Sequence, residues 1–427
     1  MNIIISNAYC YLNKGDAGII RAMVQEFKKE YPDSKIKVIS LYKDLDQGKY
    51  GDCEVIDCLI PPYKGKSRLM KIIRNVFLFC LIYLLNSLGV PFNSTSKDIK
   101  NADIVVSCGG GYLKARNLAQ FLGDFMYHYV QFTTALQYRK KLVIYAQTVG
   151  TFGNEFVKSR IKNLLQKSSL ILPRETISYN YLCGFIPDAK NYFHTSDIAF
   201  LLDKKKVNVN IPFQQKLKIG ITMRTWHFPG EADRAGLLEN YKMAVINMIK
   251  HISSNYNASI YLMPQVIGPG PDNDLLISTE VYQEFLKNDS VHLVNDDLTP
   301  EELKYLYSKM DLFIGTRMHS NIFALSEHVP CVAISYDLKT DGIMQDVGLG
   351  DYVLNIKGIK EKELIQKVDS AIHSLDSMKE ILTLSVPKIK DKSRLNNVLL
   401  NQLIKGKLNN GNGEALTQKT SNLSMEL

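Results

Sequence analysis

Short runs rich in β-branched residues alternate with longer helical patterns in two successive series along this chain. In the first series we expect a strand over 3–6, a helix over 16–30 and a strand over 35–41. The second series begins with a strand expected over 218–223 and runs to a strand over 331–335. Strands separated by helices of about ten residues or more form βαβ units, in which right-handed crossovers join parallel strands. The alternation therefore predicts an α/β protein with two parallel sheets.

The length of 427 residues, 45% of them hydrophobic, suits two domains that each bury a core. Two such sheets in tandem normally leave a cleft at the carboxyl ends of their strands, so the predicted fold is two Rossmann-like domains facing a central cleft. We expect an N-terminal α/β domain over 1–200 with a basic and apolar insertion at about 62–96, a linker over 201–216 and a C-terminal α/β domain over 217–385. The polar tail 386–427 is expected to be partly disordered.

The cysteines, the N-terminus and the net charge narrow the class of protein. Seven scattered cysteines, mostly in apolar runs, favour reduced core thiols over disulfides or a zinc site. The sequence MNIIISNAYC has no basic segment and only three consecutive isoleucines, so a cytoplasmic location is expected. A net charge of +9 favours anionic partners such as phosphorylated metabolites, acidic lipid surfaces or nucleic acid. Among these three classes we expect no nucleic acid partner.

The segment 64–90 joins a basic stretch to an apolar one. No acidic residue occurs between Pro61 and Lys97, and an unbroken apolar run covers 76–85. This run is shorter than the ~20 residues of a spanning helix, but a helix in the headgroup plane of an anionic membrane needs no such length. The segment thus predicts either peripheral contact with the inner face of the cell membrane or a buried core helix. The lack of a clear polar face over 76–85 keeps the second alternative open.

Two glycine-containing turns follow expected strands in the first half. Asp16, in the turn Asn-Lys-Gly-Asp, would lie at a helix N-terminus, either as a catalytic residue facing the cleft or as a helix cap. Gly109, Gly110 and Gly111 follow the strand 104–107. Their backbone N–H groups would cradle a phosphate or let a sugar approach the main chain, unless the run is a structural loop. The spacing fits neither a dinucleotide site nor a P-loop, so NAD and ATP are not expected.

The third motif, Gly-Thr-Arg-Met-His-Ser, follows an expected strand over 312–314. Arg317 and His319 lie at the first turn of a helix, where both can lean toward one anion, with Ser320 beside them. Further candidates occupy loops after other strands, and they are Arg174, Arg224, Gln265 and Lys339. The cations together predict a strongly electropositive pocket, with no metal site.

The order of these motifs resembles the polysaccharide pyruvyl transferase family over roughly residues 2–350. The segments that carry the resemblance are the Asn-x-Gly-Asp turn ending at Asp16, Ala-Asp-Ile-Val-Val-Ser-x-Gly-Gly-Gly at 102–111, Tyr-Ala-Gln-Thr-Val-Gly at 145–150, Arg-Glu-Thr-Ile-Ser-Tyr from Arg174, Ser-Asp-Ile-Ala-Phe at 196–200, Gly-Thr-Arg-Met-His at 315–319, and Tyr336 and Lys339 leading to Gly342, Asp346 and Gly348. The segment 64–90 looks like an insertion, and the polar tail lies outside the pattern.

The resemblance implies a GT-B-like architecture and transfer of a pyruvyl group from phosphoenolpyruvate to a sugar of a cell-surface polysaccharide or of its lipid-linked precursor. The product would be a ketal, phosphate would be released, and no cofactor or metal would be needed. The C-terminal domain would bind the donor. As a hypothesis, Asp16 and His319 share the proton transfers in either order, and Arg317 holds the donor anion. Arg224 and Lys339 would assist, since a small donor with a carboxylate and a phosphate needs several cations.

Two alternatives remain. A GT-B glycosyltransferase that uses a nucleotide sugar would need a carboxylate for the ribose hydroxyls, and the nearest acid after the third motif is Glu327. A non-catalytic glycolipid-binding protein at the membrane would be expected to lack the cationic pocket. The sequence does not select the acceptor sugar.

Overall fold

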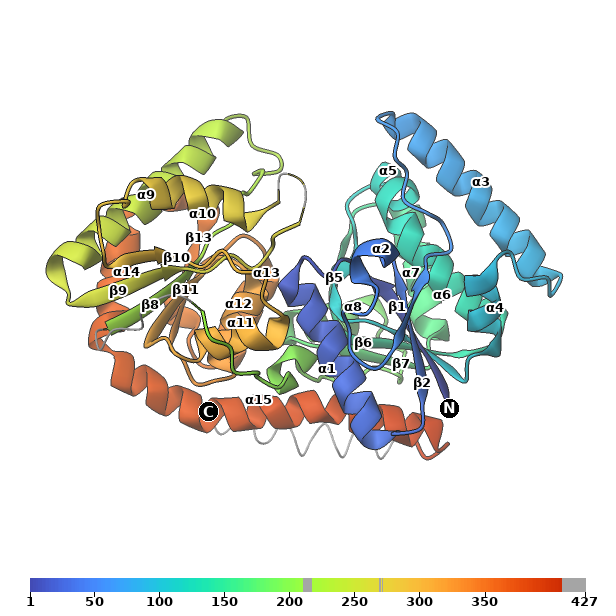
Figure 1. The fold of residues 1–427 in the computed structure, drawn as a ribbon. Coiled ribbons are helices and arrows are strands. Elements are labelled where there is room, and N and C mark those ends of the chain that lie inside the picture. Colours follow the sequence, from blue (N-terminus) through green and yellow to red (C-terminus); the bar gives the residue numbers. More distant parts are fainter. Residues whose placement is uncertain (210–216, 269, 271, 409–427) are drawn as a thin grey trace. The chain divides into compact units, whose positions relative to one another are not determined.

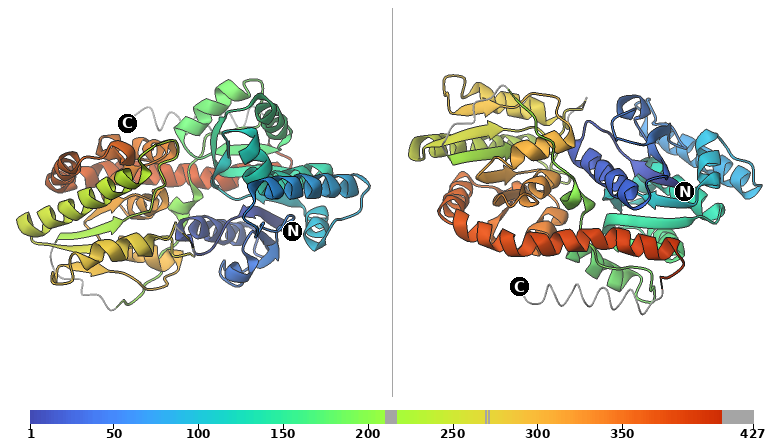
Figure 2. Two further views of the ribbon diagram at one scale, coloured as in Figure 1. Left: turned by 90° about the horizontal axis from the view of Figure 1, so that it is seen from above. Right: turned by 60° about the horizontal axis from the view of Figure 1, so that its bottom comes forward.

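The chain forms two parallel β-sheets, each at the centre of its own folding unit. The computed structural model describes residues 1–209, 217–268, 270 and 272–408. The first unit comprises Met1–Tyr11, Ile19–Ile198 and the chain from Asp391, and the second comprises Leu12–Gly18 and Ala199–Lys390. Helices lie on both faces of each sheet (Figures 1 and 2). The predicted α/β class with two parallel-sheet domains is therefore confirmed.

The sheet of the first unit has strand order β3-β2-β1-β4-β6-β5, with β7 paired to β6, and each pairing is parallel. Its central strands are buried on both faces, which explains their continuous β-branched runs. The strands are β1 (Asn2–Ala8), β2 (Lys35–Ser40), β3 (Glu54–Asp57), β4 (Ile104–Ser107), β5 (Gly110–Ala115), β6 (Lys141–Phe152) and β7 (Leu170–Pro173). The helices are α1 (Lys14–Glu30), α2 (Lys43–Asp46), α3 (Arg68–Ser87), α4 (Ser94–Asn101), α5 (Leu118–Gln120), the π-helical turn η1 (Phe121–Phe125), α6 (Met126–Gln137), α7 (Glu155–Lys167), α8 (Thr176–Phe185) and the 3₁₀ turn η2 (Ile198–Leu201), which ends in the second unit.

The sheet of the second unit has strand order β10-β9-β8-β11-β12-β13, again parallel. The strands are β8 (Leu217–Thr222), β9 (Ala258–Leu262), β10 (Val291–Leu293), β11 (Leu312–Gly315), β12 (Cys331–Ser335) and β13 (Val353–Asn355). The helices are α9 (Arg234–Asn255), α10 (Asp274–Gln283), α11 (Pro300–Tyr307), α12 (Met318–Leu325), α13 (Leu338–Asp346), the 3₁₀ turns η3 (Gly350–Tyr352) and η4 (Ile356–Gly358), α14 (Glu361–His373) and α15 (Leu375–Ile404).

The first turn of α1 belongs to the second unit, so residues 12–18 lie outside the first unit, although the expected N-terminal domain over 1–200 includes them. The backbone N–H of Lys14 donates to the carbonyl of Gln265 (3.1 Å), and that of Ile267 donates to the carbonyl of Leu12 (3.0 Å). The buried side chain of Lys14 reaches Asp297, with Nζ and Oδ1 2.7 Å apart. These bonds fix the Asn-Lys-Gly-Asp turn against the loop after β9.

Residues 386–404 of the expected polar tail continue α15, so this helix crosses the boundary expected at residue 385. Its end is held in the first unit: Asn396 donates to the carbonyl of Ser196 (2.8 Å), and Asn397 accepts from the hydroxyl of Tyr145 (2.6 Å). Residues 210–216 of the expected linker and residues 409–427 of the expected tail lie outside the described residues.

Candidate active site

Four of the predicted cationic and polar residues follow adjacent strands of the second sheet. Arg224 follows β8, Gln265 follows β9, Arg317 follows β11, and Lys339 lies in α13 after β12. Because β9, β8, β11 and β12 are neighbours and parallel, their carboxyl ends lie along one edge of the sheet. The sequence-based grouping of these residues therefore agrees with the topology.

The turn at the start of α1 brings Asp16 into the same unit as His319. The side-chain oxygen of Asn13 accepts from the backbone N–H groups of Gly15 (3.2 Å) and Asp16 (3.4 Å), so Asn13 caps the helix. The amide of Asn13 donates to Oδ2 of the partly exposed Asp16 (2.6 Å). Gly15 lies against His319, since a Cβ added to Gly15 would be 2.8 Å from His319 Nδ1. Asp16 is thus no helix cap, and the two candidate proton-transfer residues share one unit.

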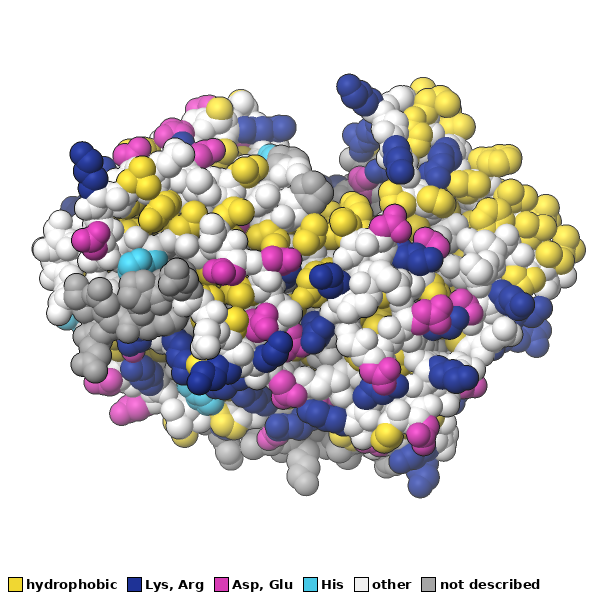
Figure 3. Space-filling model, viewed as in Figure 1, with side chains coloured by type: hydrophobic (Ala, Val, Ile, Leu, Met, Phe, Trp, Pro, Cys, Tyr) yellow, Lys and Arg dark blue, Asp and Glu magenta, His cyan; other side chains and the backbone are white. Residues whose placement is uncertain are grey.

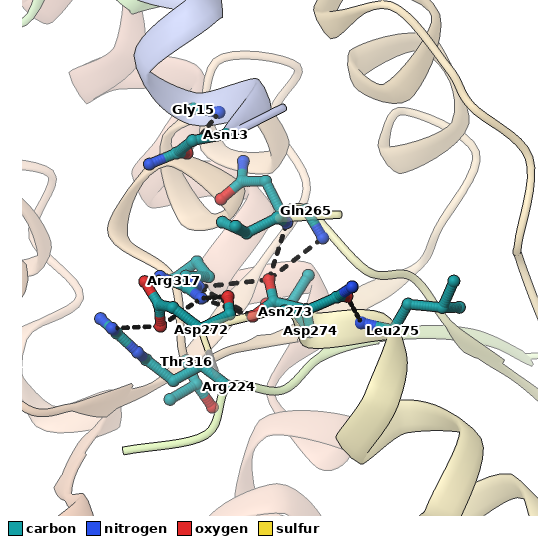
Figure 4. Close-up of polar contacts among 12 residues, drawn as sticks. Asn13, Gly15, Arg224, Gln265, Asp272, Asn273, Asp274, Leu275, Thr316 and Arg317 are labelled. Carbon is teal, nitrogen blue, oxygen red and sulfur yellow. Dashed lines mark hydrogen bonds and ion pairs between the residues drawn. The ribbon is translucent and has the colours of Figure 1, made fainter. Parts of the chain in front are cut away.

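A cluster of two arginines and two aspartates occupies this edge (Figure 4). Arg317 Nη2 lies 2.6 Å from Oδ1 of Asp274 and 2.9 Å from Oδ1 of Asp272. Arg224 Nη2 lies 2.7 Å from the same oxygen of Asp272. The Asp274 side chain is fully buried, whereas that of Asp272 is 49% exposed. Asp272 therefore bridges two arginines at the surface, and Asp274 fixes Arg317 from within.

The loop after β9 positions Asp274. Its Oδ2 accepts from the backbone N–H groups of Gln265 (3.2 Å) and Val266 (2.9 Å). Burial raises the pKa of Asp274, against the lowering effect of Arg317. For Asp272 burial also acts to raise the pKa, but Arg317 and Arg224 outweigh it and the pKa is lowered. Two carboxylates thus offset the arginines, and the prediction of a strongly electropositive pocket needs this correction.

Positive potential persists around Tyr336. The guanidinium carbon of Arg224 lies 4.2 Å from the ring centre of Tyr336 and 4.8 Å from that of Trp226. Lys339 Nζ lies 5.7 Å from the Tyr336 ring centre. Although burial acts to raise the pKa of Tyr336, Lys339, Arg224 and Arg317 lower it. The three cations therefore create a positive environment around the phenol, which stabilises negative charge there.

Two buried donors in this cluster lack a hydrogen-bond partner within the described part of the chain. They are Nε2 of Gln265 and Nε of Arg224. Buried polar groups are nearly always paired in folded proteins, and leaving one unpaired costs about 1–3 kcal/mol. An oxygen-rich or anionic ligand would supply the missing acceptors.

Two predicted substrate contacts have structural partners instead. The buried Ser320 hydroxyl donates to the carbonyl of Arg317 (2.7 Å) and pairs with the hydroxyl of Thr222 (2.7 Å), which ties α12 to β8. Arg174 lies in the first unit with no exposed surface, where Nη1 donates to Asp197 (2.6 Å). Both side chains are thus engaged by protein partners in this arrangement, and their contact with a substrate stays a prediction.

The glycine run also differs from the expected anion cradle. Gly110 and Gly111 belong to β5, and the carbonyl of Gly110 accepts from the amide of Gln147 (2.8 Å). A Cβ at Gly109 would lie 2.7 Å from the carbonyl oxygen of Ala146. The glycines permit close packing of β5 on β6 within the first unit, which accounts for the residue type without a ligand.

Sequence reasoning missed Asp272, Asp274, Trp226 and Tyr336 as site residues. Two aspartates flanking Asn273, which caps α10, were the available signal for an acidic partner of Arg317. In the sequence, Tyr336 stands out only as part of a motif. Among the described residues, no group of three or more His, Cys, Asp or Glu side chains is placed to hold a metal ion.

Comparison with known proteins agrees with the motifs. The chain is 23% identical over 411 residues to the amylovoran biosynthesis protein AmsJ of Erwinia amylovora, covering 89% of this chain and 94% of that protein. Among solved structures, UDP-GlcNAc 2-epimerase from Neisseria meningitidis, bound to UDP-GlcNAc, has a TM-score of 0.59 at 12% identity, with 95% of this chain and 100% of that chain covered. Anabaena HepE in complex with UDP has a TM-score of 0.54 at 12% identity, with the same coverage of 95% and 100%. These structures share the two-domain GT-B-like fold.

The family comparison covers most of the chain and includes the turn before Asp16 and the motif around Arg317. The model that matches is that of polysaccharide pyruvyl transferase, over residues 13–337. The resemblance expected from the order of the motifs is thereby confirmed, and the chain belongs to the polysaccharide pyruvyl transferase family.

Proposed function

We propose that this protein transfers a pyruvyl group from phosphoenolpyruvate to two hydroxyls of a sugar in a cell-surface polysaccharide or in its lipid-linked precursor. The product is a cyclic ketal, and phosphate is released. The observation that carries the proposal is the contact between Gly15 and His319, which joins the turn bearing Asp16 to the unit that holds the arginine cluster. Proton-transfer groups and anion-binding groups are then parts of one unit.

The donor takes the position that Asp272 occupies between the two arginines. Asp272 is half-exposed and is held only at the surface of the cluster, so a dianionic or trianionic donor can compete with it for Arg317 and Arg224. Asp274 keeps Arg317 oriented during this exchange, because its carboxylate is buried and also accepts two backbone N–H groups. Lys339 adds a third cation, and the unpaired Nε of Arg224 gains an acceptor.

The reaction needs groups that donate a proton to the enol and accept protons from the two sugar hydroxyls. It involves no change of oxidation state. A proton is added to the methylene carbon of the enol, which becomes the methyl group, and one sugar hydroxyl attacks the resulting oxocarbenium-like carbon and loses its proton. The second hydroxyl then displaces phosphate, and its proton leaves with the phosphate or with the base. His319 and Asp16 divide these transfers, in either order.

The alternative function, a glycosyltransferase that uses a nucleotide sugar, would need Glu327 to bind the ribose hydroxyls of the donor. Arg317 precedes α12 and Glu327 lies two residues beyond its end, and the eight residues of this helix alone span about 12 Å at 1.5 Å per residue. It is paired with Lys204 and with the buried Lys304. Although burial acts to raise the pKa of Glu327, these lysines lower it. A carboxylate committed to two lysines at the far end of the helix is poorly placed to bind a ribose.

The test is acceptor-dependent release of phosphate from phosphoenolpyruvate by the purified protein with a panel of lipid-linked saccharides. A pyruvyl ketal adds a defined mass to the acceptor, which mass spectrometry detects. We expect loss of both signals in Arg317→Ala and His319→Ala and no loss in Lys357→Ala, which removes an exposed cation of the second unit that pairs with Glu231.

Two results would contradict the proposal. Stabilisation against heat by a nucleotide sugar, without any effect of phosphoenolpyruvate, would favour the glycosyltransferase. Binding of the saccharide without turnover of either donor would favour a non-catalytic glycolipid-binding protein.

A further inference from the structure

Helix α3 packs Ile82 into the core of the first unit but carries most of its large apolar side chains on its exposed side. Its fully buried positions include two asparagines, Asn75 and Asn86, which are 0% and 4% exposed. Its outward positions are apolar, as Leu69 and Phe77 show with 67% and 65% exposure. A helix that covers a core places polar groups in water and apolar groups inside. The exposure of these apolar side chains therefore excludes the alternative, left open by the sequence, that α3 is a helix buried in the core.

The inward asparagines attach α3 to its neighbours at both ends. Asn75 donates to the carbonyl of Gly123 in η1 (2.8 Å). Near the other end, Asn86 donates to the hydroxyl of Thr134 in α6 (3.2 Å) and accepts from that of Ser96 (2.8 Å). These bonds hold one face of α3 along η1 and α6 and keep the opposite face outward.

The outward face forms a continuous apolar stripe, which we call the α3 stripe. Its members recur at intervals of three or four residues, the spacing of one side of a helix. They are Leu69, Ile73, Phe77, Cys80, Leu84 and, just after the helix, Leu88. Figure 3 shows hydrophobic side chains gathered over α3 at the edge of the first unit. Contiguous exposed apolar surface of this kind marks an interaction site rather than a scatter of single residues.

Positive charge lies at the beginning of the stripe. Lys64, Lys66 and Arg68 are exposed just before or at the first turn of α3, and no acidic residue lies between Pro61 and Lys97 to offset them. Lys71 and Arg74 follow within the helix, with Lys71 paired to Asp124. The occupant of the stripe must therefore accept apolar side chains and present negative charge beside them.

We propose that the α3 stripe lies in the headgroup region of an anionic membrane, with its apolar side chains in the acyl boundary and Lys64, Lys66 and Arg68 against lipid phosphates. Among the described helices, α3 is the one whose length of 20 residues and mean hydropathy of 1.7 would allow it to cross a membrane. Its polar bonds to η1 and α6 favour lying on the surface, because a spanning helix would have to break them. This inference is independent of the proposed reaction, and its test uses no activity.

The test measures sedimentation of the full chain with vesicles of phosphatidylcholine containing phosphatidylglycerol, compared with vesicles of phosphatidylcholine alone. We expect binding to the anionic vesicles that weakens with salt. Replacing Lys64, Lys66 and Arg68 by Gln should weaken it roughly fivefold for each cation removed. The triple variant Ile73→Ser/Phe77→Ser/Leu84→Ser should abolish binding at every salt concentration.

A matched control removes exposed apolar side chains from other surfaces. Phe156, Leu286 and Leu384 are 49%, 68% and 64% exposed, and their triple replacement by Ser should leave vesicle binding unchanged. Circular dichroism and thermal melting of each variant establish that it is folded. Equal loss of binding in the control and stripe variants would overturn the proposal.

Cys80 offers a direct reporter because it is the exposed cysteine of the seven and lies in the stripe. In a Cys53→Ser/Cys183→Ser background, a polarity-sensitive fluorophore on Cys80 should shift to shorter wavelengths on anionic vesicles. An unshifted spectrum despite vesicle binding would show that another surface binds lipid. Absence of binding, together with a dimer that the stripe variant dissociates in sedimentation analysis, would instead assign the stripe to a second copy of the chain.

Discussion

The imidazole of His319 fills the space in which any residue other than glycine at position 15 would carry its side chain. A Cβ at Gly15 would lie 2.8 Å from both Cβ and Nδ1 of His319. The first turn of α1 and the first turn of α12 are therefore in contact at the point where the two candidate proton-transfer residues lie. This contact explains why a turn near residue 15 and a motif near residue 319 belong to one functional unit.

Replacing Gly15 by Ala should displace His319 and reduce turnover without unfolding the protein. A displacement of about 1 Å in a reacting group can lower a rate by about 100-fold, so we expect kcat to fall by that order. The control is Gly18→Ala, whose Cβ would meet the end of the Phe323 ring at 2.6 Å instead of His319. Similar kcat values for the two variants, measured by phosphate release, would contradict a catalytic role of the Gly15 contact.

The two aspartates that bind Arg317 should differ in their effect on stability. Asp274 is fully buried, so Asp274→Ala leaves Arg317 short of its inner partner and should cost about 3–5 kcal/mol in the free energy of unfolding. Asp272 is 49% exposed, and Asp272→Ala should cost about 1 kcal/mol or less. Urea denaturation of both variants measures the difference. Equal costs would mean that the two carboxylates do not play distinct roles.

The fold was predictable where hydrophobic periodicity is strong. The strands expected over 104–107 and 331–335 coincide with β4 and β12. The end of α15 was not predicted, because residues 386–404 contain many Lys and Asn side chains and include Pro387, which disfavours a helix interior. The helix there depends on tertiary contacts, among them buried Leu399 and the bond between Asn396 and Ser196.

The site was predictable only as a list of residues. The motif around Arg317 identified the cation, but its partner Asp274 lies 43 residues earlier in the chain. Local sequence patterns do not indicate which distant carboxylate will pair with Arg317. A pocket of cations was therefore expected where the structure has ion pairs between two arginines and two aspartates. Similarly, Asn13 rather than Asp16 caps α1, because the side chain of Asn13 reaches two backbone N–H groups.

Acid should destabilise the first unit through His128. Its Nδ1 lies 3.2 Å from Oδ1 of Asn7, and its ring stacks on Tyr112 at 4.3 Å. Burial lowers the pKa of His128 to about 4, with a small opposing effect of Asp124. The unfolded chain, with an ordinary histidine pKa of about 6.5, therefore binds the proton first as the pH falls. Stability should decrease between pH 6.5 and 4, by about 2–3 kcal/mol.

The measurement for His128 is the free energy of unfolding as a function of pH, for wild type and His128→Phe. The phenylalanine keeps a ring against Tyr112 but binds no proton, so its profile should be flatter over this range. The variant is expected to be less stable at pH 7, where the hydrogen bond to Asn7 is lost, and to approach wild type near pH 4. Parallel profiles would show that other groups cause the acid sensitivity.

Asp272→Asn should bind phosphoenolpyruvate more tightly than wild type if the donor replaces this carboxylate between the arginines. The asparagine has a similar size but carries no charge, so Arg224 and Arg317 lose a competing anion that now lies 2.7 and 2.9 Å from them. A gain of 1.4 kcal/mol corresponds to about tenfold in affinity, and we expect a decrease of the dissociation constant of this order in calorimetry. Arg224→Gln should weaken binding, and the double variant should fall between them. If Asp272→Asn instead weakens binding, the carboxylate organises the arginines for the donor and does not compete with it.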